Sequence, residues 1–263
     1  MSVHIVVLLK MVPDVVEDLE IAPDGKALDL EYLRMILSES DDHALEEALL
    51  LKERHGAKVT VLALDAPEVD DALFTALAKG ADRVIKIAGV DAGLSTRQAA
   101  RALAQAIRKD PGLMQADLML TGVQAIDDLD GLIAPLLAHE LGRPYLGIIT
   151  RVGLDGGGKT AVATKEYPGG VRGEFEVKLP AVLGMQAAEK PPRYVPVAKV
   201  RAAMKSQKID AVPVATLADG DLPAVQVVGM KRNEPAGHAV ILDGSSERVA
   251  EQLCEILAGR GIF

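Results

Sequence analysis

Short apolar runs alternate with amphipathic stretches along the first 150 residues. Four runs predict strands, and the first of them is almost continuously apolar, as expected of a strand buried on both faces of a parallel sheet. They cover residues 3–9, 58–64, 82–88 and 117–121. The stretches between them repeat apolar residues at helical spacing. This spacing predicts helices over residues 41–55, 67–79, 95–109 and 131–141. Repeated strand-helix units predict an α/β fold, a Rossmann-like parallel sheet with helices on both faces.

The pattern changes after Tyr145. One strand is expected over residues 146–152. The next two runs alternate in polarity around Pro168-Gly169-Gly170, which predicts a β-hairpin insertion over 159–179. Another strand is expected at 181–186, little periodicity follows over 189–214, and 246–260 predicts a final helix. We therefore divide the chain into an α/β domain, 1–210, and a C-terminal arm and helix, 211–263.

Composition shows how this core is built and excludes several classes of protein. Of the 263 residues 49% are hydrophobic but only 3% aromatic, so the core rests on Ala, Val, Leu and Ile. A net charge of −9 without a basic run argues against nucleic acid as a partner. No apolar run approaches the roughly 20 residues that span a bilayer, and the N-terminal run lacks the marks of a signal peptide. We expect no membrane insertion and a cytoplasmic location.

Residues 153–160, GLDGGGKT, fit the phosphate-loop pattern G-x-x-x-x-G-K-[ST]. In a working phosphate loop a helix must follow, because its N-terminal amides hold the phosphates. Here TAVATKEYPGG follows, which alternates in polarity and ends in a turn signal. We interpret the motif as a glycine-rich turn, with a phosphate-loop hydrolase as the alternative from the enzyme class.

Other catalytic or metal-binding signals are weak. The five histidines are spread along the chain without an H-x-x-x-H pair, so we interpret them as ordinary surface or packed side chains. The single cysteine, Cys254, excludes a disulfide framework and lies on an apolar stripe, which predicts a core position. Asp127, Asp128 and Asp130 could hold a cation or act as a base, but a solvated acidic loop is the interpretation we favour. We predict no catalytic residue and no metal site.

One loop has the position of a ligand site. Thr121 to Asp128, TGVQAIDD, follows a buried strand and precedes a helix. In open parallel sheets ligands bind beyond the carboxyl ends of the strands, where the strand ends at Lys10 and Asp65 also lie. Backbone amides of this loop and near Gly131 could meet phosphates, and an adenine could lie against Leu8. From the pattern alone, a nucleotide pocket and a plain structural loop are equal alternatives.

The order and spacing of five segments make the chain recognisable. They are KMVPD at 10–14, ALEEALLLKE at 44–53, ALAKGADRVIKI at 76–87, TGVQAIDD at 121–128 and PPRY at 191–194. With these segments the sequence resembles the beta subunit of electron transfer flavoproteins over essentially its whole length.

The resemblance implies a subunit without catalytic residues of its own. It implies a heterodimer with an alpha subunit and an FAD shared with that subunit, which binds most of it. A dehydrogenase would be the electron donor, and a quinone reductase or another protein the acceptor. The family's beta subunit usually buries an AMP as well. In electron-bifurcating members a second FAD takes that place and meets NADH, and this alternative stays open. So does a stand-alone adenine-nucleotide-binding module of related fold.

The resemblance also assigns residues. The cofactor-binding positions it implies lie at strand ends, before the second helix, and along the loop after residue 121. They are Leu8, Ser38, Ser40, Asp41, Asp65, Gly122, Val123, Gln124, Ala125, Ile126, Asp127, Asp128, Gly131, Leu132 and Ile133. The docking loop for the dehydrogenase, 189–208, would use Pro192, Arg193, Tyr194 and Val197. The C-terminal arm would embrace the alpha subunit.

Several positions depart from the family. Its N-P-[YF]-[DC] is Ser38-Glu39-Ser40-Asp41 here, so the aromatic that packs near the flavin is missing at Ser40. The polar, phosphate-binding stretch is replaced by residues 129–133, LDGLI, and Val123 stands where a lysine is common. Val197 corresponds to the leucine that anchors the dehydrogenase. Whether AMP, a second FAD or nothing fills the beta-subunit site therefore stays open.

Overall fold

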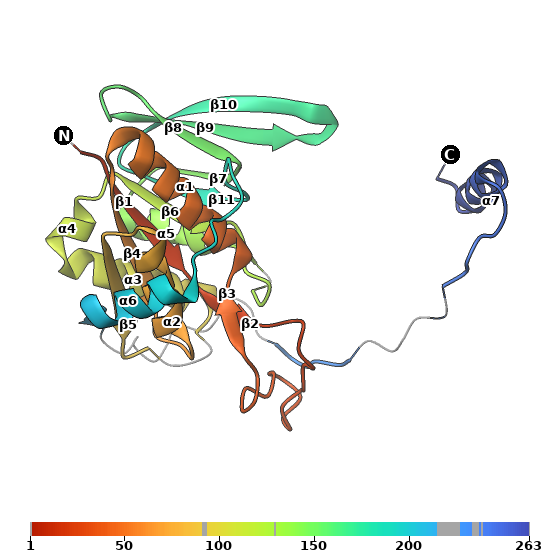
Figure 1. The fold of residues 1–263 in the computed structure, drawn as a ribbon, viewed down its shortest axis with the longest axis horizontal. Coiled ribbons are helices and arrows are strands. Elements are labelled where there is room, and N and C mark those ends of the chain that lie inside the picture. The colour runs from red at the N-terminus through yellow and green to blue at the C-terminus, as the bar shows by residue number, and fades with distance from the viewer. Residues whose placement is uncertain are drawn as a thin grey trace. The chain divides into compact units, whose positions relative to one another are not determined.

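Seven parallel strands form the central sheet of the protein (Figure 1). The computed structural model describes residues 2–90, 94–128, 130–214, 227–232, 237 and 239–262. The strands follow one another in the spatial order β12-β5-β4-β1-β6-β11-β7. Their bounds are β12 (Asp210–Pro213), β5 (Arg83–Ala88), β4 (Lys58–Leu64), β1 (His4–Leu9), β6 (Leu118–Gly122), β11 (Ala181–Met185) and β7 (Tyr145–Ile149). The predicted Rossmann-like parallel sheet is confirmed.

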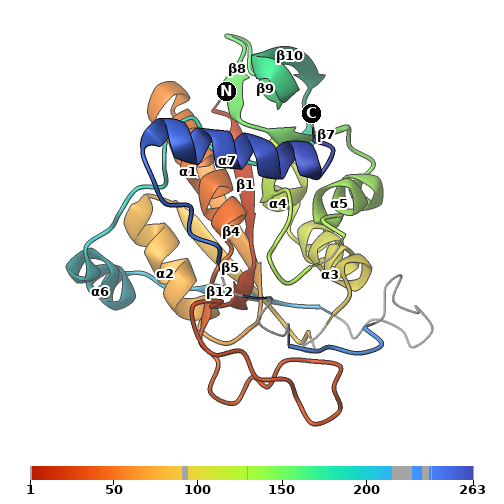
Figure 2. The same ribbon diagram turned by 90° about the vertical axis from the view of Figure 1, so that its right-hand side faces the viewer.

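Helices cover both faces of this sheet, as predicted (Figure 2). One face carries α1 (Glu39–His55) and α2 (Val69–Lys79), and the other carries α3 (Thr96–Lys109), the short α4 (Pro111–Met114) and α5 (Ile133–Leu141). Strand β1 shows why both faces are apolar, because its successive side chains point to opposite sides. Val7 packs in the core under α1 and α2, whereas its neighbour Val6 packs in the core under α3 and α5.

Most helices begin and end close to the predicted residues, because capping residues next to them determine these ends. Helix α1 ends at Gly56, whose left-handed backbone (φ 66°) is the conformation that glycine adopts at low cost. Ser95 caps α3 with a capping box to Gln98. The helix expected from Pro67 starts later, at Val69, because Glu68 takes a left-handed conformation (φ 60°). The Glu68 carboxylate accepts a hydrogen bond from the Met35 amide, which connects this irregular turn to β3 (Met35–Leu37).

The predicted hairpin is confirmed and belongs to a second sheet. Strands β9 (Thr160–Tyr167) and β10 (Val171–Lys178) pair antiparallel around the turn η1 (Pro168–Gly170), and β8 (Arg151–Leu154) adds a third strand. The single strand expected over 146–152 is wrong, since β7 and β8 lie in different sheets on either side of Thr150. The GKT motif lies at the β8–β9 turn, where Asp155 accepts bonds from the amides of Lys159 and Thr160. The interpretation as a turn, not a phosphate loop, is confirmed.

Regular structure was missed in three places, the smallest of which is the four-residue helix α4. The stretch 189–214 contains α6 (Val197–Ser206) and the edge strand β12, so the predicted docking loop 189–208 is partly helical. Helix α6 buries only Ala203, so it lacks the apolar stripe that reveals a helix in the sequence. Strand β2 (Met11–Pro13) pairs antiparallel with β3 directly after β1. Three-residue strands are too short to show a period.

Residues 21–27 and 228–263 form a second unit, whose main element is α7 (Ser246–Gly259). Ser245 caps this helix through the Arg248 amide. No described residue of α7 is buried, and Cys254 is exposed, so the predicted core position of Cys254 is wrong. An apolar stripe in the sequence shows that one face of a helix is apolar, but it does not show whether the core of the same chain covers that face. Residues 215–226 of the predicted arm and His238 lie outside the described residues. No helix in the described part of the chain is long and apolar enough to cross a membrane.

Candidate functional site

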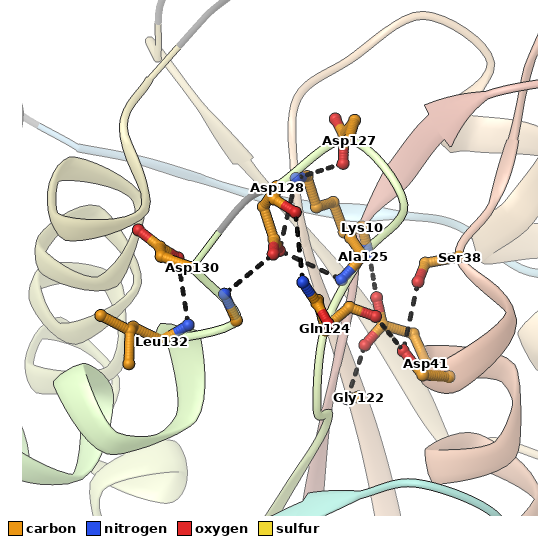
Figure 3. Close-up of polar contacts among 12 residues, drawn as sticks. Lys10, Ser38, Asp41, Gly122, Gln124, Ala125, Asp127, Asp128, Asp130 and Leu132 are labelled. Carbon is orange, nitrogen blue, oxygen red and sulfur yellow. Dashed lines mark hydrogen bonds and ion pairs between the residues drawn. The ribbon is translucent and has the colours of Figure 1, made fainter. Parts of the chain in front are cut away.

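The N-terminus of α1 connects two strand ends at the carboxyl edge of the sheet (Figure 3). The carboxylate of Asp41 is buried there. Its Oδ2 accepts a hydrogen bond from the Lys10 amide at 2.9 Å, and its Oδ1 accepts one from the Gly122 amide at 2.6 Å. Lys10 follows β1 and Gly122 ends β6, so one side chain holds both strand ends in place. Asp41 was predicted as a cofactor contact, but its two oxygens are engaged within the protein.

The loop after β6 approaches α1 so closely that residue 122 has no room for a side chain. A Cβ on Gly122 would lie 2.1 Å from Ser40 Oγ and 2.6 Å from Asp41 Oδ1. Ser40 Oγ donates a hydrogen bond to the Gln124 carbonyl at 2.8 Å and lies 3.4 Å from Ser38 Oγ. Ser38, Ser40 and Asp41 therefore form a polar contact between the start of α1 and residues 122–124.

The buried position of Asp41 predicts a pH dependence of stability. Burial raises the pKa of the Asp41 carboxyl from 3.8 to about 7, although the amides of Gly122 and Lys10 favour the ionised form. Between about pH 4 and about pH 7 the folded chain keeps a proton that the unfolded chain has released. The free energy of unfolding then falls by about 1.4 kcal/mol per pH unit as the pH rises.

In urea unfolding, this contribution is present in the wild-type chain together with those of other carboxyls such as Glu47, and we expect it to be missing in Asp41→Asn, which has no such proton. The protonated Asp41 stabilises the wild-type chain at low pH, and this stabilisation is lost as the pH rises through about 7. The difference in the free energy of unfolding between wild type and Asp41→Asn should therefore change between about pH 4 and about pH 7 and stay constant below that range. Parallel profiles for the two proteins would contradict the assignment.

Aspartates close the loop that leads into α5. Asp128 Oδ2 accepts a bond from the Ala125 amide at 3.1 Å, and its Oδ1 accepts one from the Gly131 amide at 3.0 Å (Figure 3). Asp130 Oδ1 accepts a bond from the Leu132 amide at 3.1 Å. Gly131 has a left-handed backbone (φ 57°), and a Cβ there would lie 3.0 Å from the Val123 carbonyl oxygen. Three amides of this region, those of Ala125, Gly131 and Leu132, thus donate to carboxylates of the loop itself.

A positive charge reaches the loop from a different strand. Lys10 Nζ lies 2.6 Å from Asp127 Oδ1 and 3.9 Å from Asp128 Oδ2. The loop sequence alone gave no basic residue, so this ion pair was missed. Its signal was the position of Lys10 directly after a buried strand, which places it at the same edge of the sheet. Among the residues that the structure describes, no cluster of three or more His, Cys, Asp or Glu side chains is arranged to hold a metal ion.

The remaining predicted cofactor positions differ in exposure. Leu8 is buried in the core under α3 and α5, and Asp65 pairs with Lys86 at 3.6 Å on the neighbouring strand β5. Val123 donates its amide to the Met185 carbonyl at the end of β11. In contrast, Ile126 and Leu132 are exposed, with 63% and 45% of their surface accessible. The loop therefore presents two apolar side chains outward, alongside the exposed Gln124 and Asp127.

Arg193 anchors the predicted docking segment to α1. Its Nε and Nη2 donate to both oxygens of the buried Glu46 carboxylate at 2.8–3.1 Å, and its Nη1 donates to Glu53 at 2.6 Å. Burial opposes the ionisation of Glu46, but hydrogen bonds from Arg193 hold the pKa of this carboxyl below its ordinary value. The next residue, Tyr194, is 84% exposed, and Val197 is 61% exposed at the start of α6. Pro192 is half-buried. Arg193 thus fixes the segment on α1, while the side chains of Tyr194 and Val197 remain exposed.

Two further side chains of α1 hold the chain that precedes this anchor. Glu47 is fully buried and accepts bonds from the amides of Val152 and Glu189, at 2.7 and 2.9 Å. His43 Nδ1 accepts a bond from the Ala188 amide at 3.1 Å. Burial raises the pKa of the Glu47 carboxyl. Helix α1 therefore contacts both the loop after β6, at its N-terminus, and the docking segment, along its side. The sequence gave no sign of this role, because acidic positions on a helix are usually solvated.

Comparison with known proteins agrees with this arrangement. The family model described as "Electron transfer flavoprotein domain" matches residues 27–217. An electron transfer flavoprotein subunit beta from Methylophilus methylotrophus is 29% identical, over 96% of this chain and 97% of the relative. The subunit of that name from Clostridium acetobutylicum is 35% identical, over 75% of this chain and 73% of the relative. One from Thermoanaerobacterium thermosaccharolyticum is 29% identical, over 99% of this chain and the whole relative. The chain therefore belongs to the electron transfer flavoprotein family, among its beta subunits.

Proposed function

We propose that this chain is the beta subunit of a heterodimeric electron transfer flavoprotein. With an alpha subunit it helps to hold FAD, and the pair carries electrons from a dehydrogenase to a quinone reductase or another acceptor. The observation that carries the proposal is the double role of α1, which contacts the TGVQAIDD loop through Ser40 and Asp41 and the docking segment through Glu46. Two of the segments that carry the resemblance, TGVQAIDD and PPRY, thus contact the same helix.

The residues at the carboxyl edge fit the apolar part of a flavin better than its phosphates. Ile126 and Leu132 offer exposed apolar surface at this edge, whereas Asp128 and Asp130 engage the nearby amides. Ile126 and Leu132 would line the side of the site that faces the alpha subunit. When bound, FAD supplies the redox chemistry. In this proposal the chain forms part of the FAD site and positions the flavin, without a catalytic residue of its own.

The exposed apolar residues of the second unit suit a further contact with the alpha subunit. Leu253 and Ile256 on α7 are 48% and 40% exposed, and Val240 and Ile241 before it are more than 80% exposed. Exposed apolar side chains of this kind are typical of protein interaction sites when they lie together. In the proposal, this unit is the arm that embraces the alpha subunit.

Tyr194 and Val197 are expected to carry the docking of the dehydrogenase. Exposed aromatic and apolar anchors on a rigid base are typical hot spots of binding, and their truncation costs about 2 kcal/mol or more. We expect Tyr194→Ala and Val197→Ala to slow reduction of the flavin by a co-purifying dehydrogenase at least about tenfold at subsaturating concentration. The flavin content of the pair should stay unchanged.

The matched control is Tyr32→Ala, because Tyr32 is equally exposed, at 88% against 84% for Tyr194. Stopped-flow reduction of the co-produced pair gives the rates, and absorbance of the released flavin gives its content. Equal rates for wild type and both docking variants would contradict the docking role. A co-produced pair that never holds flavin would contradict the proposed function itself.

A further inference from the structure

The docking segment has no secondary structure of its own before α6. Residues 187–196 form neither helix nor strand, and three of them, Pro191, Pro192 and Pro196, are proline. Proline restricts the backbone and has no amide to donate. Among the described residues, no backbone carbonyl accepts a hydrogen bond from an amide of residues 188–195. The position of this segment therefore depends on side chains that contact it from other elements.

Three side chains of α1 accept hydrogen bonds from amides of the segment. The pairs are His43 Nδ1 with the Ala188 amide at 3.1 Å, Glu47 Oε2 with the Glu189 amide at 2.9 Å, and Glu46 Oε2 with the Arg193 amide at 3.0 Å. Residues 43, 46 and 47 are three and four positions apart, so they lie on one face of the helix. The segment is thus fixed at two points, one before the pair of prolines and one after it.

The first of these points is also connected to β8. The Glu189 carboxylate pairs with Arg54 Nη2 on α1 at 2.7 Å and with Arg151 Nε on β8 at 3.4 Å. The second oxygen of Glu47, Oε1, accepts a hydrogen bond from the Val152 amide of β8 at 2.7 Å. A helix and a strand of the second sheet therefore hold the start of the segment together, so that it does not depend on the Arg193 anchor alone.

We propose that His43 and Glu47 are positioning residues for the docking of the dehydrogenase. Glu47 is fully buried, so it acts through the segment and not by touching a partner. By fixing the start of the segment, the two side chains hold Tyr194 and Val197 in place before the partner arrives. A segment that is already ordered does not have to lose conformational entropy on binding, which favours a tighter complex. The inference rests on the proposed function and adds to it how the docking residues are presented.

The test uses the complete pair of this chain with its alpha subunit. Reduction of its flavin by a co-purifying dehydrogenase is measured over a range of dehydrogenase concentrations, which gives a half-saturating concentration and a limiting rate. His43→Ala removes the acceptor of the Ala188 amide, whereas His43→Asn keeps one, because its carboxamide oxygen can take the place of Nδ1. The matched control is His55→Ala, since His55 is an exposed histidine in the last turn of the same helix.

We expect His43→Ala to raise the half-saturating concentration about fivefold, while the limiting rate and the FAD content stay unchanged. This factor corresponds to about 1 kcal/mol, the lower range of the cost of ordering one backbone residue. His43→Asn should recover most of the affinity, and His55→Ala should match the wild type. Glu47→Gln keeps only one of two charged acceptor oxygens and should also raise the half-saturating concentration. If His43→Ala loses its thermal transition, Glu47→Gln decides by the same criterion.

A second background separates positioning from a general loss of stability. In a pair that already carries Tyr194→Ala and Val197→Ala, the docking side chains are absent, so His43→Ala should change the half-saturating concentration by less than about twofold. A role in stability alone would lower the melting temperature and the FAD content in both backgrounds and leave the half-saturating concentration unchanged.

Two results would overturn the inference. One is a half-saturating concentration that neither His43→Ala nor Glu47→Gln raises. The other is an equal rise for His43→Ala in both backgrounds, because the effect would then not act through Tyr194 and Val197. The wild-type pair reports on the proposed function separately. A wild-type pair without FAD, or with FAD that no dehydrogenase reduces, contradicts that function, whereas a pair that is reduced normally in all variants contradicts only the inference.

Discussion

Arg193→Ala is expected to lower the free energy of unfolding by about 3 kcal/mol. The substitution leaves the Glu46 carboxylate buried without its partner, and breaking one side of a buried ion pair typically costs about 3–5 kcal/mol. We place the value at the lower end because the Arg193 side chain is 28% exposed and partly screened. The backbone bond from the Arg193 amide to Glu46 remains, but the two-oxygen contact that orients the segment is lost. Urea unfolding of the purified chain gives the value.

The control for Arg193 is an arginine whose ion pair lies at the surface. Arg172 pairs with Glu166 at 3.0 Å, with 71% and 48% of the two side chains exposed. Exposed pairs contribute about 0–1 kcal/mol, so Arg172→Ala should leave stability almost unchanged. Arg193→Lys should fall between wild type and Arg193→Ala, since lysine keeps the charge but cannot bind both oxygens of Glu46 in the fork geometry of arginine. Equal losses in the free energy of unfolding for Arg193→Ala and Arg172→Ala would refute the role of Arg193 as the anchor of the docking segment.

Gly122→Ala should destabilise the chain by about 2–3 kcal/mol. The new Cβ would lie 2.1 Å from Ser40 Oγ and 2.6 Å from Asp41 Oδ1, which is closer than real contacts allow. Either α1 or the loop must shift, and overpacking of a tight contact typically costs about 1–3 kcal/mol. The shift also strains the bond from the Gly122 amide to Asp41, so the loop loses its position relative to β1. Thermal unfolding of the chain measures the loss.

The matched control is Gly156→Ala in the β8–β9 turn, where an added Cβ meets nothing within 4 Å. This variant should be neutral, or slightly more stable because alanine restricts the unfolded chain. Replacing Ser40 with glycine in the Gly122→Ala background should recover part of the stability, since it removes the nearest atom. Equal stability of Gly122→Ala and Gly156→Ala would show that the loop and α1 are not in close contact.

The sequence predicted the buried strands because their apolar runs depend only on local composition. It also predicted the hairpin, since Pro168, Gly169 and Gly170 form a turn between two alternating runs. The end of α1 at Gly56 and the capped start of α3 at Ser95 follow from neighbouring residues. Each of these features is decided within one turn or one strand, which is the range that a single sequence describes well.

The contacts that build the candidate site join residues far apart in the chain. Lys10 and Asp127 are 117 residues apart, and Arg193 and Glu46 are 147 apart. Such pairs exist only once the sheet has formed and α1 has packed against it. Asp128 and Asp130 were read as a solvated acidic loop, whereas both accept bonds from loop amides. The sequence identifies each charged residue, but the group that this residue binds is determined by the tertiary structure.

The most direct test of the central proposal is the composition of the assembly that this chain forms. The full chain, co-produced with its alpha subunit, is purified through a tag on this chain and weighed intact by native mass spectrometry. The account predicts a mass equal to one copy of this chain, one alpha subunit and one FAD. A homodimer of this chain without flavin, or a pair that holds no FAD, would contradict the account.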